Sequence, residues 1–395
     1  MHAPPARRNR RALLLVAALA VLVTALPSAA GSAPATPAKA PHATPGAVAS
    51  AAPAATEAGL AVLRAGGNAV DAAVAVALAL AVVHPAAGNL GGGGFAVVKI
   101  GDLLDALDFR ETAPAAATRD MYLDAGGKPV PERSLVGPLA AGVPGSPAGL
   151  YELHRRFGRL PFRKVAAPAI RLASRGFTVT DRLHRELEDE REILSRFPGT
   201  AAVWLAAGRP LPTGATVRLP QLAATLRAYA VRGPAALMRG RRAAQLARAA
   251  KDAGGVLTAQ DLADYRPVWR APVRFRAFGW DVASMPLPSS GGIILGETFG
   301  MLERASAALP PSGSAERAHL LAEIWRRAYA DRFLLGDPST TRAAAEQLLA
   351  GPWLDERARS IERASATPST RVRPFPGRAP GEARETTHVS VVDGD

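Results

Sequence analysis

Hydrophobic and polar positions change character sharply at the start of the chain. Ala12 to Leu26 is an apolar run that only Thr24 interrupts, and it follows a segment with four arginines at positions 7, 8, 10 and 11. Small residues come next, from Ser28 to Gly31. This order is typical of a secretory signal peptide, and the run is shorter than the ~20 residues that a membrane span needs. We therefore predict a signal peptide over residues 1–31 and a secreted or periplasmic protein, with a signal anchor as the alternative.

The pattern changes again where the folded part is expected to begin. Residues 32–52 are rich in Ala, Pro, Thr and Gly, which predicts a flexible spacer. From Pro53 the spacing favours a helix that Gly66 and Gly67 end. Asn68 can cap a second helix, which runs to Val83 and is apolar on almost every side. Such a helix is usually buried in a layered domain.

A glycine-rich segment, GNLGGGGF at 88–95, separates these helices from two predicted strands. It lacks the Lys-Ser/Thr pair of a phosphate-binding loop, so we favour a close backbone crossing or a strand entry. Strands are expected at 95–100 and 103–109, with Gly101-Asp102 as the hairpin turn. Arg110 follows the second strand directly.

The middle of the chain is predicted to be mainly helical. Helix-compatible spacing covers residues 146–157, 162–174, 234–253 and 258–265, and short strands are expected at 273–275 and 280–284. A long helix should run from about Ser314 to Leu335 and end at Gly336-Asp337-Pro338. Its apolar positions Leu321, Ile324, Trp325 and Ala328 follow the helical period, so they should form the buried face.

Near its end the chain becomes rich in Pro, Arg and Ser, which predicts an exposed, mobile segment over residues 362–385. Val389 to Asp393 alternates as a strand does, and Asp393-Gly394-Asp395 resembles a hairpin turn. A domain rarely ends within a hairpin, so we expect the sequence to be part of a longer protein and this strand to lack a following partner.

Composition excludes some classes of function, but it indicates the function less directly than the motifs do. The net charge is +14, but the arginines are dispersed through helical stretches and aromatic residues amount to only 5%. Bases would find few stacking platforms, and no nucleic-acid-binding motif is present, so we expect no nucleic-acid partner. The chain has no cysteine, hence no disulfide framework and no lipid attachment through a thiol. We expect no metal or other cofactor and no stable membrane span.

Seven motifs, in order along the chain, resemble those of the γ-glutamyltranspeptidase family. They are LRAGGNAVDAAVA at 63–75, GNLGGGGF at 88–95, DFRETAP at 108–114, GVPG at 142–145, PSSGG at 288–292, YADR at 329–332 and TTHVSVVD at 386–393. The resemblance implies an α+β fold, the four-layer αββα sandwich of N-terminal-nucleophile hydrolases. It also implies a precursor that cleaves itself into two subunits, with residues 53–385 as the large subunit. Residues 386–395 would be the start of a small subunit that is otherwise absent, so the sandwich would be incomplete.

By the same resemblance the precursor is cleaved between Glu385 and Thr386, and Thr386 is the nucleophile. The chemistry is coherent, because a threonine hydroxyl needs an adjacent base. Cleavage frees an α-amine whose pKa is roughly 7.7–8, which suits general-base catalysis near neutral pH. Alone, a threonine here would be interpreted as a strand residue, and Thr387 is the neighbour most easily mistaken for the nucleophile. We treat His388 as structural.

The resemblance also makes Arg110 the group that holds the α-carboxylate of a γ-glutamyl substrate. A guanidinium pairs with a carboxylate through two parallel hydrogen bonds, which fits that role. The alternative is a surface arginine paired with Asp108 or Glu111. Asp331 and Arg332 are expected to form an internal ion pair, and Ser289 and Ser290 lack the context of a catalytic serine.

Three hypotheses follow. The first is a γ-glutamyltransferase/glutathione hydrolase precursor that acts on glutathione-like γ-glutamyl compounds, with amino acids, peptides or water as acceptors. The second is an acylase of the same fold that cleaves glutaryl or β-lactam side-chain amides. The third is a non-catalytic remnant. In the family the small subunit carries the oxyanion hole, so we expect the 395-residue chain by itself to be inactive.

Overall fold

The computed structural model describes residues 46–305, 308–341, 344–375 and 387–394. The predicted signal peptide, most of the predicted spacer, Glu385 and Thr386 lie outside these residues. Within the described ranges, none of the helices has the length and apolar character that crossing a membrane requires.

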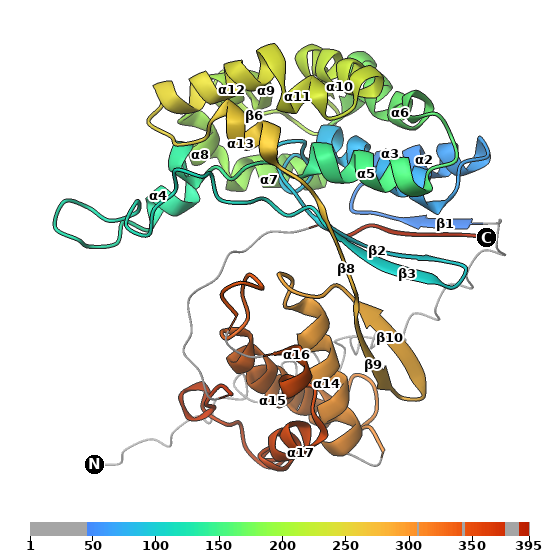
Figure 1. Cartoon of the computed structure of the whole chain (residues 1–395), viewed down its shortest axis with the longest axis vertical. Coiled ribbons are helices and arrows are strands. Elements are labelled where there is room, and N and C mark those ends of the chain that lie inside the picture. Colours follow the sequence, from blue (N-terminus) through green and yellow to red (C-terminus); the bar gives the residue numbers. More distant parts are fainter. Residues whose placement is uncertain (1–45, 306–307, 342–343, 376–386, 395) are drawn as a thin grey trace, which may run out of the picture. The chain divides into compact units, whose positions relative to one another are not determined.

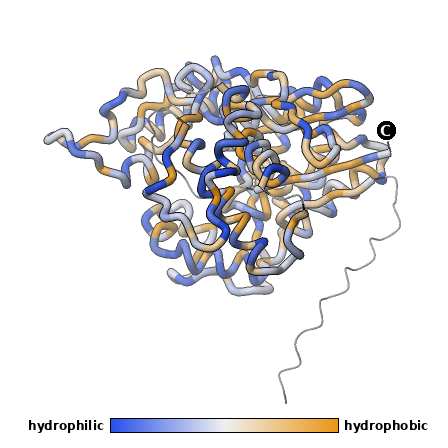
Figure 2. Tube along the Cα trace, turned by 90° about the horizontal axis from the view of Figure 1, so that it is seen from below, coloured by the Kyte–Doolittle hydropathy of each residue, from blue (hydrophilic) through white to orange (hydrophobic). Residues whose placement is uncertain are grey.

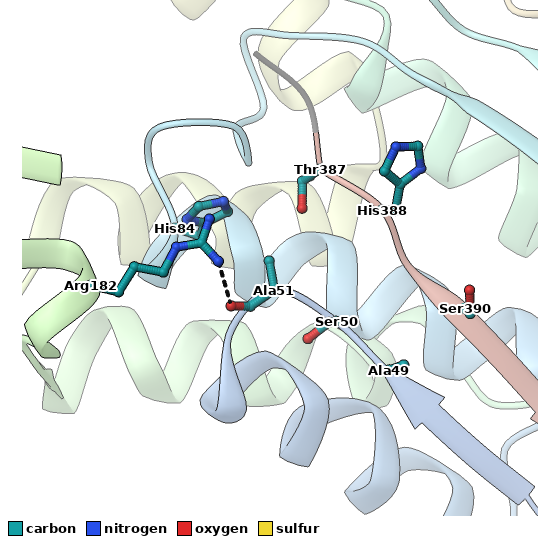
Figure 3. A pocket seen from close by; sticks show the side chains of 8 residues that line it. All are labelled: Ala49, Ser50, Ala51, His84, Arg182, Thr387, His388 and Ser390. Carbon is teal, nitrogen blue, oxygen red and sulfur yellow. Dashed lines mark hydrogen bonds between the residues drawn. The ribbon is translucent and has the colours of Figure 1, made fainter. Parts of the chain in front are cut away.

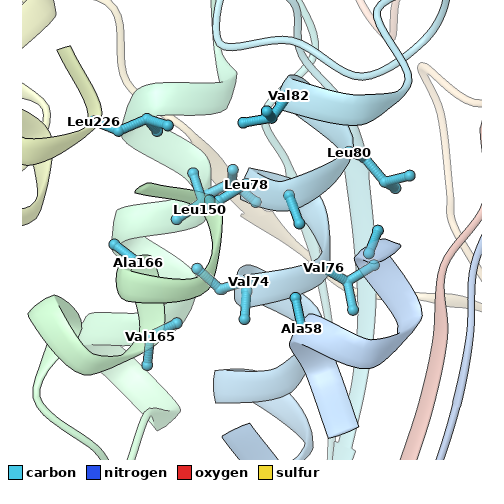
Figure 4. Close-up of a cluster of buried hydrophobic side chains, with 14 of the residues drawn as sticks. Ala58, Val74, Val76, Leu78, Leu80, Val82, Leu150, Val165, Ala166 and Leu226 are labelled. Carbon is cyan, nitrogen blue, oxygen red and sulfur yellow. The ribbon is translucent and has the colours of Figure 1, made fainter. Parts of the chain in front are cut away.

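The core forms around the helix that the sequence predicted to be buried. This helix, α3 (Ala69–Val83), begins at a capping box in which Asn68 and Asp71 each accept a hydrogen bond from the other's backbone N–H. It packs against α2 (Pro53–Arg64), α5 (Ser146–Phe157) and α6 (Phe162–Arg175). Figure 4 shows its valines and leucines directed at side chains from all three neighbours. Because α3 has neighbours on several sides, apolar residues are needed around nearly its whole circumference.

Four further helices form a continuous series, and the first of them packs on α6. They are α10 (Pro220–Arg232), α11 (Ala235–Met238), α12 (Gly240–Asp252) and α13 (Ala259–Asp264), each in contact with the next (Figure 1). The single helix predicted over residues 234–253 is therefore wrong. Arg239 has extended backbone angles, and Gly240 has a φ of +63°, which a residue with a side chain rarely adopts.

Short elements lie between α6 and α10 in the sequence, although these two helices pack directly on each other. They are α7 (Asp181–Asp189), α8 (Arg191–Ser195), α9 (Pro198–Trp204) and the two-residue strands β4 (Phe177–Thr178), β5 (Leu205–Ala206), β6 (Arg209–Pro210) and β7 (Thr216–Val217). Before α5 lie α4 (Glu132–Leu135) and a 3-10 turn, Pro138–Ala140.

Two small antiparallel sheets carry the motifs. One has the order β2 (Phe95–Ile100), β3 (Leu103–Asp108), β8 (Val268–Arg270), and its first two strands are the predicted hairpin. The other pairs β1 (Gly46–Ala49) with β11 (Ser390–Asp393). The predicted spacer is thus too long at its C-terminal end. Ala47 and Ala49 are exposed and Val48 packs on the core, so this stretch has the alternation of a strand despite its small residues.

The last part of the chain, residues 273–375, is built on a hairpin of β9 (Val273–Ala277) and β10 (Trp280–Ser284). Its helices are α14 (Gly291–Ala305), α15 (Ala315–Arg332), α16 (Ala345–Leu348) and α17 (Gly351–Arg359). Hydrophilic and hydrophobic positions alternate along many of the helices, as the colouring of Figure 2 shows. The face predicted for α15 is partly wrong, because Trp325 is 49% exposed while the charged residues Glu323, Arg327 and Asp331 are buried.

Those buried charges are paired, although not as the sequence suggested. Asp331 accepts two hydrogen bonds from Arg357 and one from the indole N–H of Trp353 at 3.3 Å. Arg332 instead donates to Ser290 Oγ at 3.0 Å, so the expected Asp331–Arg332 ion pair is wrong. The reason is helical geometry, since neighbouring residues point about 100° apart and only Asp331 faces α17.

The same carboxylate fixes the beginning of the segment that was predicted to be mobile. Asp331 Oδ1 accepts a hydrogen bond from the backbone N–H of Phe375, whose ring packs edge-on against Trp353 with centroids 4.8 Å apart. A 3-10 turn, Ser369–Arg371, lies just before it, and Thr367 N donates to Glu323 Oε1 at 2.9 Å. Buried carboxylates thus contact this segment at Thr367 and Phe375, while most of the described residues 362–375 are exposed, and its mobility stays a prediction.

Candidate active site

The backbone around Arg110 is fixed from several directions. Arg110 N donates to Asp108 Oδ1 at 3.0 Å, and the Tyr265 hydroxyl donates to Arg110 O at 2.8 Å. Burial, and then the charges of Asp108 and Glu111, raise the pKa of Tyr265 well above its ordinary value. The phenol therefore stays protonated and remains a hydrogen-bond donor at neutral pH.

Close backbone crossings confine the same turn. A Cβ on Gly93 would lie 2.5 Å from Phe109 O, and one on Gly145 would lie 1.8 Å from the same atom. Gly145 N and Ser146 N both donate to Gly92 O at 2.9 Å. The glycine run at 91–94 is thus a close backbone crossing, as the sequence suggested. Residues 108–110 are packed between this run and the segment at Gly145.

The side chain of Arg110 remains available for a ligand. Its neighbour Asp108 is already paired with Arg270, whose Nε and Nη2 each lie 2.9 Å from Asp108 Oδ2. Arg110 is exposed, and Nη1 donates to Pro288 O at 3.2 Å, in the PSSGG motif. The alternative in which Asp108 pairs with the Arg110 side chain is therefore wrong, because the carboxylate binds the Arg110 backbone and a different guanidinium.

Another carboxylate near this arginine has an environment that keeps it ionised. Hydrogen bonds from Ser339 lower the pKa of Asp337 first, and the positive charges of Arg270 and Arg110 lower it further. Asp337 belongs to the Gly336-Asp337-Pro338 segment that ends α15. Arg110, Arg270 and Asp337 thus lie near one another although they are distant in sequence.

The strand that follows the predicted nucleophile is anchored on two sides. β11 pairs with β1 in the register Ala49↔Ser390 to Gly46↔Asp393. In addition, Asp393 Oδ2 accepts a 2.6 Å hydrogen bond from Ala69 N in the first turn of α3. A carboxylate is stabilised there by the unpaired N–H groups and the dipole of the helix N-terminus. The sequence analysis considered only a following partner for this strand, whereas the partner that the structure shows precedes it by more than 300 residues.

Thr387 and His388 lie on opposite sides of the chain as it enters β11. A pocket of about 360 Å³ is lined by Ala49, Ser50, Ala51, His84, Arg182, Thr387, His388 and Ser390. Figure 3 shows the Thr387 hydroxyl directed toward Ala51 and the His388 ring turned away from it. Among the described residues the Thr387 hydroxyl is buried without a hydrogen-bond partner, whereas His388 is exposed.

The two predicted site regions, Arg110 and the residues that follow Thr386, thus have different neighbours in the structure. Arg110 contacts the segment around Pro288, and it does not line the Thr387 pocket. The sequence analysis did not predict three features of these site regions, which are β1, the contact of Tyr265 and the Asp108–Arg270 pair. Only the alternation in Gly46–Ala49 could have revealed β1. In the described part of the chain, no group of His, Asp and Glu side chains has the arrangement of a metal site.

Comparison with known proteins agrees with this arrangement. The family model of gamma-glutamyltranspeptidase matches residues 55–395, which include Arg110, the PSSGG motif and β11. The chain belongs to the γ-glutamyltranspeptidase family. The crystal structure of Helicobacter pylori gamma-glutamyltranspeptidase is similar, with 36% identity and a TM-score of 0.81 over 85% of this chain and 97% of that one. The fold prediction, an α+β N-terminal-nucleophile hydrolase, is thereby confirmed.

Two curated relatives of this chain carry names that indicate different activities, a glutathione hydrolase and an acylase. The glutathione hydrolase proenzyme of Escherichia coli is 42% identical over 345 residues, which is 86% of this chain and 59% of that protein. The acylase ACY 1 proenzyme of Pseudomonas sp. (strain SE83) is 37% identical over 344 residues, 85% of this chain and 61% of that protein. The chain therefore spans about three fifths of the length of these relatives.

Proposed function

We propose that this chain is the large-subunit part of a γ-glutamyltransferase/glutathione hydrolase precursor that cleaves itself between Glu385 and Thr386. The family membership and the similarity to a glutathione hydrolase proenzyme support this. Residues 1–31 would direct export to the periplasm or outside the cell.

After cleavage the α-amine of Thr386 accepts the proton of the threonine hydroxyl, and the oxygen attacks the γ-carbonyl of the substrate. The amide bond breaks, the proton passes to the leaving amine, and the γ-glutamyl group remains on Thr386 as an ester. An amino acid, a peptide amine or water then attacks this ester and restores the hydroxyl. These three acceptors distinguish transfer from hydrolysis.

The observation that carries the proposal is the state of Arg110. Its backbone is fixed by Asp108, Tyr265 and the glycine crossings, while its guanidinium is exposed and has no carboxylate partner among the described residues. A guanidinium on a fixed backbone and without a paired carboxylate suits a ligand carboxylate, because part of the ordering cost of binding is already met. The γ-glutamyl group has such a carboxylate next to its α-carbon.

The decisive experiment uses the chain extended to the length of its relatives. Gel analysis and N-terminal sequencing should show a small fragment that begins with Thr386. Thr386→Ala should abolish both cleavage and turnover of a chromogenic γ-glutamyl amide, whereas Thr387→Ala should retain cleavage. A small fragment that begins at Thr387 would move the nucleophile by one residue, and an uncleaved native chain would refute the proposal.

The second candidate is the acylase, which the 37% identity to acylase ACY 1 proenzyme supports. Glutaryl amides resemble γ-glutamyl amides but lack the α-amine. Comparing kcat/KM for matched glutaryl and γ-glutamyl amides separates the two functions. A preference for the glutaryl amide would favour the acylase.

A further inference from the structure

The positive charge of this protein is concentrated in one stretch that the proposed reaction does not use. Residues 193–251 contain nine arginines, one lysine and no Asp or Glu. By contrast, residues 46–192 have sixteen basic and sixteen acidic side chains, and residues 252–395 have seventeen basic and eighteen acidic ones. Beyond residue 45, the net charge therefore comes from this basic stretch.

The fold keeps these charges on the surface. Nine of the ten basic residues are exposed and Arg242 is half-buried. Six of the ten lie on α10 and α12, two helices that both contact α11 (Figure 1). On α10 the buried residues Ala223, Leu226 and Tyr229 face the core, while Arg227 at the edge of that face and Arg232 on the far side of the helix are exposed. The basic side chains of α10 and α12 thus lie on two helices that share α11 as a neighbour.

Few of these charges are neutralised within the protein. In the described part of the chain, two of the ten form ion pairs, Arg196 with Glu132 at 2.6 Å and Arg248 with Asp252 at 3.5 Å. Arg218 and Arg239 donate only to main-chain carbonyls. At an ionic strength of about 0.1 M, charges within roughly 10 Å of one another still interact, so the surface presents a sustained positive potential.

Apolar side chains accompany the arginines and indicate the kind of partner. Phe197, Val203, Val231 and Leu246 are 40%, 38%, 62% and 48% exposed. Basic groups mixed with exposed apolar side chains are typical of helices that lie on a bilayer surface. A nucleic-acid surface would need several stacking platforms, but of the three aromatic residues here only Phe197 is exposed, since Tyr229 is fully buried and Trp204 is half-buried.

We propose that the basic stretch is a peripheral binding surface for anionic phospholipid bilayers. The recognised chemistry is the phosphate of lipid headgroups, presented as a dense anionic plane. Each Lys or Arg near such a plane contributes about fivefold to affinity at low salt. The attraction is reversible and is distinct from the membrane span that the described residues lack.

The test is vesicle co-sedimentation of the full chain with phosphatidylcholine alone and with a phosphatidylcholine/phosphatidylglycerol mixture. The apolar run Ala12–Leu26 and the four arginines before it are the same in every variant, so the readout is how the ratio of the two affinities changes from the native protein to each variant. We expect strong preference for the anionic vesicles at about 0.1 M salt and its loss at about 1 M, where screening extends only ~3 Å.

The triple variant Arg227→Glu, Arg232→Glu, Arg241→Glu should reduce that ratio by at least about a hundredfold. The matched control is Arg119→Glu, Arg274→Glu, Arg276→Glu, which changes the net charge equally on exposed residues elsewhere and should leave most of the preference. Thermal unfolding of both variants verifies that they fold. If the variants lose binding equally, only net charge matters and the surface assignment fails.

Three other results would overturn the proposal. The first is an equal affinity for both vesicle types. The second is displacement by millimolar inorganic phosphate, which would indicate a discrete phosphate site. The third is tighter binding to single-stranded DNA than to anionic vesicles in the same buffer, which would make the partner a nucleic acid.

Discussion

Two aspartate–arginine pairs in this protein have opposite consequences. Asp108 is buried and pairs with the half-buried Arg270, and this pairing leaves the adjacent, exposed Arg110 guanidinium free for a ligand. Asp331 pairs with Arg357 in the interior and also binds Trp353 and the backbone of Phe375, so none of its hydrogen-bonding capacity remains. The same two residue types therefore prepare a binding group in one region and fasten a chain segment in the other.

The difference follows from solvation. A charge taken out of water is stabilised only when every partner is present, so the buried pair must be complete within the protein. Glu297, next to this pair, has no hydrogen bond from the described residues to either carboxylate oxygen. Burial first, and then the charge of Asp331, raise the pKa of Glu297 to about 10. Glu297 therefore stays protonated, so Asp331 supplies the negative charge beside Arg357.

Removing the buried carboxylate should have the largest effect. Asp331→Ala removes the hydrogen-bonded partner of the buried Arg357, so we expect a loss of about 3–5 kcal/mol in the free energy of unfolding. Chemical denaturation measures it. The matched control is Asp355→Ala, which breaks a partly exposed pair with Arg304 and should cost at most about 1 kcal/mol. Equal losses would show that burial does not distinguish the pairs.

The next largest effect should come from the surface arginine, and it should concern activity. In the extended, cleaved protein, Arg110→Lys keeps the charge but loses the planar fork, so transition-state binding should weaken by about 1–3 kcal/mol. Steady-state kinetics with a γ-glutamyl amide measures kcat/KM. Thermal stability should remain unchanged, and Arg119→Lys should leave both quantities unchanged. An unaltered kcat/KM would make Arg110 an ordinary surface residue.

The pH dependence of stability should report Glu297. Because its folded pKa is raised, its stabilising contribution is complete below the ordinary pKa of about 4.5 and is lost as the pH rises through about 10. Between these values one titrating carboxyl changes the free energy of unfolding by up to about 1.4 kcal/mol per pH unit.

Glu297→Gln should therefore flatten the fall in stability with rising pH, as measured by urea denaturation from acid to alkaline pH. Glu356→Gln, an exposed residue on α17, is the control and should leave the slope unaltered. Identical slopes for the native protein and Glu297→Gln would mean that Glu297 is ionised in the folded state.

The smallest effect concerns the support of Arg110. Tyr265→Phe removes the hydrogen bond to Arg110 O, so we expect a loss of about 0.5–1.5 kcal/mol in stability. In the extended protein, KM for the γ-glutamyl amide should rise while kcat changes less, because the binding group is displaced and the nucleophile is not. A fall in kcat alone would contradict this assignment.

The sequence by itself determined much of the local structure. The apolar circumference of α3, the hairpin of β2 and β3, the glycine crossing and the position of Arg110 at the end of a strand all follow from neighbouring residues. The ordered motifs also predicted the family, which the match over residues 55–395 confirmed. The assignment of Thr386 stays a prediction, because that residue lies outside the described ranges.

Only the tertiary structure decided which distant residues meet. β1 pairs with β11, which lies at the other end of the chain. Asp331 binds Arg357 rather than its neighbour Arg332. Arg270 pairs with Asp108, the carboxylate beside Arg110. The buried side of α15 includes charged residues, so the spacing of its apolar residues did not predict that side correctly. Periodicity reports which side of an element is apolar, whereas a buried polar residue is stable only through partners that the packing supplies.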